Sequence, residues 1–119
     1  MIDFQKFIKS TSFAIKGIRS MVISENNARI HLLASIVVIS TGIYVELSAQ
    51  EWLWIALAIA LVWILEAINT AIEALVDLVS PDFHPLAGKA KDIAAAAVLI
   101  ASIFAVIVGI IIFFPKLSL

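Results

Sequence analysis

Three carboxylates and an amide share one face of a long helical segment. The apolar run W-L-W-I-A-L-A-I-A-L-V-W-I-L, residues 52–65, continues without a break into E-A-I-N-T-A-I-E-A-L-V-D, residues 66–77. On a helix of about 100° per residue, the polar side chains of the second stretch fall within an arc of about 100°. They form a stripe about 16 Å long, which consists of Glu66, Asn69, Thr70, Glu73 and Asp77.

The stripe suits cation-assisted chemistry at a membrane boundary. A hydrocarbon core takes about 20 residues to cross, so a helix that enters near Trp52 places Glu66 within the core and Asp77 in the interface. An ionised side chain at the bilayer centre costs about 2.5–3.5 kcal/mol, so a cation must compensate. Carboxylates suit Mg²⁺, which shares its shell with phosphate oxygens, and a nearby carboxylate is a candidate general base. A polar seam that fixes helix register and an ion or proton pathway are the alternatives.

Composition indicates an all-α integral membrane protein. The 119 residues are 63% apolar and 14% charged, with a mean hydropathy of +1.12, and a single domain over residues 1–119 is expected. Lipid or further copies of the chain must cover the apolar surface that so short a chain cannot bury. The net charge of −1 argues against a nucleic-acid partner. The absence of cysteine excludes disulfides, thiolate catalysis and cysteine-ligated metal sites.

The hydrophobic pattern predicts four helices that position the stripe. Residues 4–23 alternate basic and apolar side chains at helical spacing, which is typical of an amphipathic helix lying in the membrane interface. Transmembrane helices are expected at 29–47, 51–79 and 92–114, and residues 80–92, with two prolines and a glycine, are expected to form a polar loop. A set of small residues spaced by four in the third span predicts close helix packing: Ala97, Ala101, Ala105 and Gly109.

The distribution of basic residues predicts the orientation. Seven lie before or at the first residue of the first span, or between the second and third spans, and the turn at 48–51 has none. The N-terminal helix and the 80–92 loop should therefore be cytoplasmic, which places the polar end of the stripe on that side. Lys116 is the one basic residue on the opposite side.

Other polar residues fall at the level of the cytoplasmic end of the stripe. Glu25 and Arg29 are four apart at the start of the first span, where an ordinary helix ion pair is the simpler interpretation. Lys91 and Asp92 begin the third span, with a snorkelling lysine and a helix cap as the simpler interpretations. His84 lies in the loop. The sequence has no Walker A or kinase catalytic-loop motif.

At this point the sequence resembles the small integral-membrane lipid kinases of bacteria, the diacylglycerol kinase/undecaprenol kinase family. The resemblance covers nearly the whole chain and is carried by four motifs in the family's order. These are A-I-K-G-I-R at 14–19, S-E-N-N-A-R-I-H at 24–31, E-A-I-N-T-A-I-E-A-L-V-D at 66–77 and H-P-L-A-G-K-A-K-D at 84–92.

The resemblance implies a homotrimer of three-span protomers in the bacterial inner (cytoplasmic) membrane, with active sites shared between protomers on the cytoplasmic side. It implies transfer of the γ-phosphate of ATP to the hydroxyl of a membrane lipid. Glu25 and Glu73 would hold Mg²⁺ with ATP, and Glu66 would be the catalytic base with Asn69 alongside. The residues implied in nucleotide binding are Arg29, Asp77, His84, Lys91 and Asp92.

Two segments favour the undecaprenol kinase branch of the family. These are I-H-L at 30–32 and F-H-P-L-A at 83–87. Diacylglycerol kinases of the Gram-negative type tend to carry an acidic residue where this chain has His31 and an aromatic hydroxyl where it has Phe13. We therefore expect undecaprenol as the substrate, with a diacylglycerol kinase forming phosphatidic acid as the alternative. A non-enzymatic cation-binding membrane subunit is the alternative from a different functional class.

Overall fold

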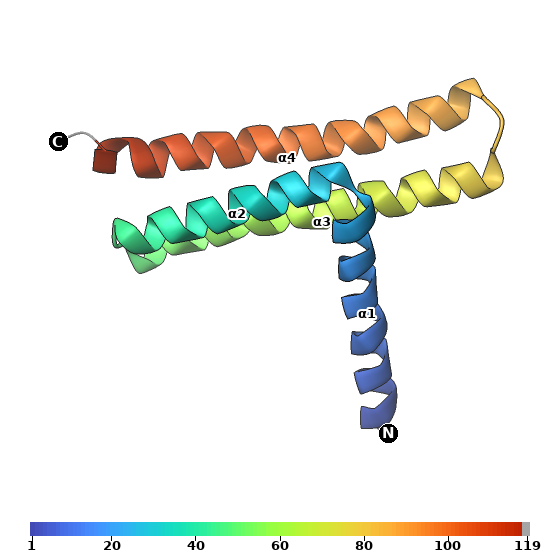
Figure 1. The fold of residues 1–119 in the computed structure, drawn as a ribbon, viewed down its shortest axis with the longest axis horizontal. Helices are drawn as coiled ribbons and strands as arrows, with labels where there is room; N and C mark the ends of the chain where they lie inside the picture. The colour runs from blue at the N-terminus through green and yellow to red at the C-terminus, as the bar shows by residue number, and fades with distance from the viewer. Residues whose placement is uncertain (118–119) are drawn as a thin grey trace.

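Residues 1–117 are described by a computed structural model, in which they form four helices (Figure 1). In chain order these are α1 (Phe4–Ser24), α2 (Asn26–Tyr44), α3 (Ala49–Val79) and α4 (Pro85–Leu117). The last three are long and apolar enough to cross a membrane. The helical architecture with three candidate spans agrees with the sequence prediction.

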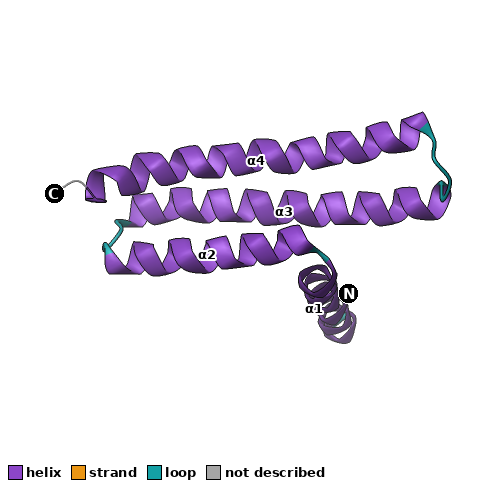
Figure 2. Ribbon diagram, turned by 45° about the horizontal axis from the view of Figure 1, so that its top comes forward, coloured by secondary structure: helices purple, strands orange, loops and turns teal. Residues whose placement is uncertain are grey.

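Three of the helices lie side by side, and α1 runs crosswise to them (Figures 1 and 2). At 1.5 Å per residue, α2 is about 28 Å long, close to the thickness of a hydrocarbon core, whereas α3 and α4 reach about 46 and 50 Å. The connection between α3 and α4 consequently projects past the N-terminal end of α2. The polar half of the stripe lies on this projecting part of α3.

Local signals set the turn between α2 and α3. Ser48 and Glu51 form a capping box, in which the Ser48 hydroxyl accepts from the Glu51 N–H and the Glu51 carboxylate accepts from the Ser48 N–H. Glu46 adopts a left-handed conformation with φ 57°, which reverses the chain within a few residues. The carboxylate of Glu51 also contacts Lys116 at 3.3 Å. The basic residue on the expected outer side is therefore partnered there.

The start of α4 differs from the expectation. The sequence predicted a polar loop as far as residue 92, but α4 already begins at Pro85. Proline is well suited to the first turn of a helix, because its missing N–H has no intrahelical partner there. The His84 ring accepts a hydrogen bond from the Leu86 N–H at 3.1 Å through Nδ1, and so satisfies one of the free donors of the first turn. Lys91 and Asp92 thus lie on the helix, about two turns from its start.

The core is a seam between α3 and α4 near the end of the bundle that holds the α2–α3 turn. Its buried members are Leu47, Ile55, Ala58, Val108 and Ile112. Of the small-residue set in α4, Ala101 is buried, and Ala105 packs beside this core. Most large apolar side chains of the three long helices remain exposed in the single chain. This surface is what a membrane-spanning protein offers to lipid or to other protomers.

Gly42 is the position where a side chain would disturb the helix contact. A Cβ built there would lie 2.6 Å from Cη2 of Trp52 and 2.9 Å from Cδ1 of Leu47. Gly42→Ala is expected to destabilise the protein by about 1–3 kcal/mol through overpacking. The midpoint of thermal unfolding in detergent should fall accordingly. Gly17→Ala is the matched control, because nothing lies within 4 Å of a Cβ at that helical position. An equal effect of the two substitutions would contradict the predicted clash.

Candidate functional site

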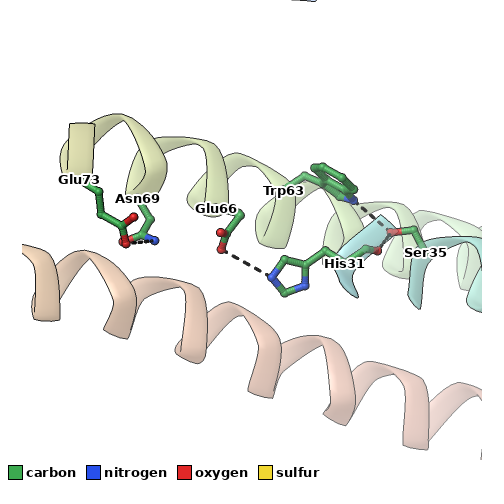
Figure 3. A network of polar contacts seen from close by, with 6 residues as sticks. All are labelled: His31, Ser35, Trp63, Glu66, Asn69 and Glu73. Atoms are coloured by element: carbon green, nitrogen blue, oxygen red, sulfur yellow. Dashed lines mark hydrogen bonds and ion pairs between the residues drawn. The ribbon is translucent and has the colours of Figure 1, made fainter. Parts of the chain in front are cut away.

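Glu66 is a buried carboxylate near the middle of the bundle. Only 1% of it is exposed, and it is the largest side chain among the described residues that is fully buried. Its Oε2 lies 3.6 Å from Nε2 of His31 on α2 (Figure 3). Because His31 is the sixth residue of α2, Glu66 is level with the second turn of that helix. The carboxylate therefore lies inside the apolar part of the bundle, at a level about 8 Å from the N-terminus of α2.

The stripe continues from Glu66 along α3 as a connected polar pair. Asn69 Nδ2 donates a hydrogen bond to Oε1 of Glu73 at 3.2 Å, and Glu66, Asn69 and Glu73 project from the same side of α3 (Figure 3). The Asn69 side chain is buried, yet its Oδ1 has no hydrogen-bond partner, and neither does Oγ1 of Thr70. An unpaired buried polar atom costs roughly 1–3 kcal/mol. These atoms can therefore bond only to a water or ligand that enters the interior of the bundle.

The polar end of the stripe joins α3 to α4. Lys91 forms an ion pair with Asp77, although 66% of the Asp77 side chain remains exposed. A pocket of about 260 Å³ lies beside this pair, between the end of α3 and the start of α4. Its polar lining includes Asp77, Asp82, His84 and Lys91. Three of the residues that the sequence singled out for nucleotide binding therefore share one pocket.

The remaining candidates are more loosely placed. Glu25 is half-buried at the junction between α1 and α2, and its charge acts on Glu66 together with that of Glu73. Glu25 precedes His31 by six residues and Glu73 follows Glu66 by seven, so both carboxylates lie about 9–10 Å beyond the His31–Glu66 contact. Arg29 and Asp92 are exposed.

The donor set suits a hard cation. Mg²⁺ is bound in proteins through one or two carboxylates and keeps several waters. Glu73 and Glu25 supply carboxylates at one level, and the unpaired Oδ1 of Asn69 is a further oxygen donor beside Glu73. Within residues 1–117, no group of three or more His, Asp or Glu side chains is close enough to enclose a metal. The fit is therefore to a partly hydrated ion, and a closed protein cage is not formed by the single chain.

An apolar cavity opens on the other side of His31. It has a volume of about 240 Å³ and lies between α2, α3 and α4. His31, Ser35 and Ser102 are the polar residues in its lining, and the others are aliphatic or glycine. Along the bundle, Glu66 thus lies between the polar pocket near the α3–α4 connection and the apolar cavity toward the α2–α3 turn, and it lines neither of them.

The sequence did not predict the contact between His31 and Glu66, nor a second contact one helical turn away. Trp63 Nε1 donates a hydrogen bond to Oγ of Ser35 at 3.1 Å, which also joins α3 to α2. The signal in the sequence was an ionisable side chain inside a transmembrane segment, which is a functional-site indicator by default. Spacing within one helix could not identify the partner, because the two residues are 35 positions apart.

Comparisons with known proteins identify the family of this chain. A family model described as prokaryotic diacylglycerol kinase matches residues 12–113. An undecaprenol kinase of Bacillus subtilis (strain 168) is 43% identical over 115 residues, which cover 97% of this chain and 94% of the relative. The diacylglycerol kinase of Escherichia coli (strain K12) is 36% identical over 104 residues, covering 87% of this chain and 85% of the relative.

A third relative extends beyond this chain. The diacylglycerol kinase of Synechocystis sp. (strain ATCC 27184 / PCC 6803 / Kazusa) is 42% identical over 109 residues, which cover 91% of this chain and 62% of that protein. These likenesses confirm the resemblance to a lipid kinase family that the motifs indicated. They also agree with the multi-pass membrane architecture of the three apolar helices. The chain belongs to the prokaryotic diacylglycerol kinase family.

Proposed function

We propose that this protein transfers the γ-phosphate of ATP to the hydroxyl of a membrane lipid alcohol, with undecaprenol as the preferred substrate. One observation carries the proposal. A buried carboxylate, Glu66, lies between an apolar cavity and a polar pocket on one helix that runs from the apolar core to the α3–α4 connection. This placement suits a kinase with one lipid and one water-soluble substrate.

Glu66 acts as the general base in this proposal. Its contact residue His31 lines the apolar cavity, which supports a role of Glu66 toward a lipid hydroxyl that approaches from the apolar part of the bundle. Phosphoryl transfer depends mainly on positioning and charge neutralisation, with little covalent help from the protein. Asn69, one turn along α3, holds Glu73 in place through its amide.

Glu73 and Glu25 would hold Mg²⁺. When bound, the ion would neutralise the negative charge of the phosphates. The common level of the two carboxylates along the bundle supports this pairing, as does the unpaired amide oxygen of Asn69. Lys91, Asp77 and His84 bind the nucleotide from the α3–α4 side, where they share a pocket. Arg29 and Asp92 complete this side of the site from exposed positions.

The active unit in this proposal is a homotrimer with shared active sites. One observation supports it: the single chain leaves many large apolar side chains of its three long helices exposed. Neighbouring protomers would cover part of this surface. The protein lies in the bacterial cytoplasmic membrane, with α1 in the interface and the α3–α4 connection in the cytoplasm, as the distribution of basic residues favours.

The preference for undecaprenol over diacylglycerol is supported by the sequence features around His31 and His84. The likeness to the Bacillus subtilis undecaprenol kinase covers more of the chain, at higher identity, than that to the Escherichia coli diacylglycerol kinase. Both substrates present a hydroxyl at the membrane surface. The chemistry at Glu66 is therefore the same for either lipid, and the preference is set by the shape of the chain that must fit beside it.

A mixed-micelle assay with γ-labelled ATP tests the proposed function. With Mg²⁺ present, label is expected in the lipid fraction, and turnover is expected to be faster with undecaprenol than with diacylglycerol at equal mole fraction. Chelation of Mg²⁺ with EDTA should remove the transfer, and restored Mg²⁺ should return it. Absence of label in both lipids would defeat the kinase proposal, whereas a preference for diacylglycerol would defeat only the choice of substrate.

Glu73→Gln tests the metal role. The substitution keeps the size of the side chain and its ability to accept from Asn69, but removes the charge that binds Mg²⁺. Turnover should fall by at least about 100-fold, while the size of the assembly by gel filtration is retained. Glu46→Gln is the control, because Glu46 is exposed in the turn between α2 and α3. Near-normal activity of Glu73→Gln would refute the metal role.

Glu66→Gln tests the base. Loss of a general base costs about 10²–10⁴-fold in rate, so kcat should fall within that range. Binding of Mg·ATP, measured by equilibrium titration, should change little because Glu66 lies away from the nucleotide pocket. If nucleotide binding is lost in parallel with turnover, the assignment of Glu66 as the base is wrong.

A further inference from the structure

His31 is placed to control the orientation of Glu66. Its Nε2 is buried, has no hydrogen-bond partner and lies 3.6 Å from Oε2 of Glu66, an oxygen that is likewise buried and unpaired. A hydrogen bond requires about 2.7–3.2 Å, so a closure of roughly half an ångström would form one. Catalytic hydrogen bonds are often long before substrate is bound and tighten in the complex.

A second contact fixes the backbone that carries His31. The hydroxyl of Ser35 donates to the main-chain carbonyl of His31 at 2.7 Å and accepts from Nε1 of Trp63 at 3.1 Å (Figure 3). Trp63 and Glu66 are three residues apart on α3, and His31 and Ser35 are four apart on α2, so each pair shares a helix face. The Trp63–Ser35 bond therefore holds α2 against α3 one turn from the carboxylate.

We propose that His31 is a positioning residue for Glu66, and that Trp63 and Ser35 hold His31 in place. Nε2–H of His31 binds Oε2 of Glu66, which stops rotation of the carboxylate and leaves Oε1 directed at the substrate hydroxyl. This inference rests on the proposed function, because it assigns a role relative to the base of that reaction. His31 itself neither gains nor loses a proton during the transfer.

The reaction step balances without a further reactant. The O–H bond of the lipid alcohol breaks and its proton bonds to Oε1 of Glu66. The lipid oxygen bonds to the γ-phosphorus of ATP as the bond from that phosphorus to the leaving oxygen of ADP breaks. His31, which donates to Oε2, holds the carboxylate before and after this transfer. The charges of Glu73 and Glu25, which act on the same carboxylate, are both negative and cannot take this role.

Two substitutions at His31 separate positioning from simple packing. His31→Gln retains a donor at about the place of Nε2, whereas His31→Leu retains volume and removes the donor. We expect His31→Leu to lower kcat by about 10–100-fold, the usual cost of losing a partner that orients a functional group, with the KM values for Mg·ATP and lipid unchanged. His31→Gln should restore kcat to within a few-fold of the original.

The opposite results overturn the proposal. If His31→Leu keeps its original kcat, or if it changes only a KM, His31 does not act through the base. If His31→Gln falls as far as His31→Leu although both remain folded by thermal unfolding, the donor is not what matters. Glu66→Gln measured in parallel tells the two proposals apart. Normal turnover there would defeat the assignment of the base, whereas low turnover there with unimpaired His31→Leu would defeat only the positioning role.

A double-mutant cycle provides a second test. Glu66→Asp keeps a carboxylate but withdraws it from His31 by one methylene. In that background His31→Leu should reduce kcat much less than it does in the original protein, because the contact is already broken. Effects of the two substitutions that simply multiply would show that His31 and Glu66 act independently, which overturns the proposal.

The support from Trp63 and Ser35 has its own matched control. Thr41 on α2 makes the same type of hydroxyl-to-carbonyl bond as Ser35, to the carbonyl of Val37 at 2.8 Å, at a position remote from Glu66. Ser35→Ala and Trp63→Phe should each lower kcat several-fold at unchanged KM, and Thr41→Val should not. If all three variants behave alike in kcat, the Trp63–Ser35 bond does not support the base.

Discussion

The structure depends on a carboxylate that is buried among apolar helices. Such a group has a large desolvation cost unless something nearby compensates it. In this chain α3 presents Glu66 to the interior, and α2 supplies His31 against it. The packing of α2 on α3 is thus tied to a polar contact as well as to aliphatic side chains, and the Trp63–Ser35 bond one turn away reinforces it.

Because the helices differ in length, an apolar cavity and a polar pocket lie on opposite sides of Glu66 along the bundle. The N-terminus of α2 lies only a short distance beyond the level of Glu66. On that side α3 and α4 extend further together and form the polar pocket around Asp77 and Lys91. Toward the α2–α3 turn, three helices enclose an apolar cavity. A lipid kinase must bring a water-soluble nucleotide and a lipid hydroxyl to one point. In the proposed function, the short α2 separates the two approaches within a single domain.

The family likeness and the polar face of α3 could both be predicted from the amino-acid sequence. The helical repeat alone places Glu66, Asn69 and Glu73 on one side, and the structure shows the Asn69–Glu73 bond there. The beginning of α4 was predicted less well. Prolines and charges between residues 80 and 92 indicated a loop, but Pro85 fits a first helical turn and His84 satisfies a donor there, so the helix starts at residue 85.

The amino-acid sequence alone predicts three apolar helices, the polar stripe on the second of them and, from its basic residues, an orientation in the membrane, because each of these depends on patterns within single segments. Only the tertiary structure decided which residues meet across segments. His31 and Glu66 are 35 residues apart, and their contact depends on how far α2 slides and turns against α3. Helical periodicity within a segment carries no information about that register, in which Trp63 bonds to Ser35 and Glu66 contacts His31.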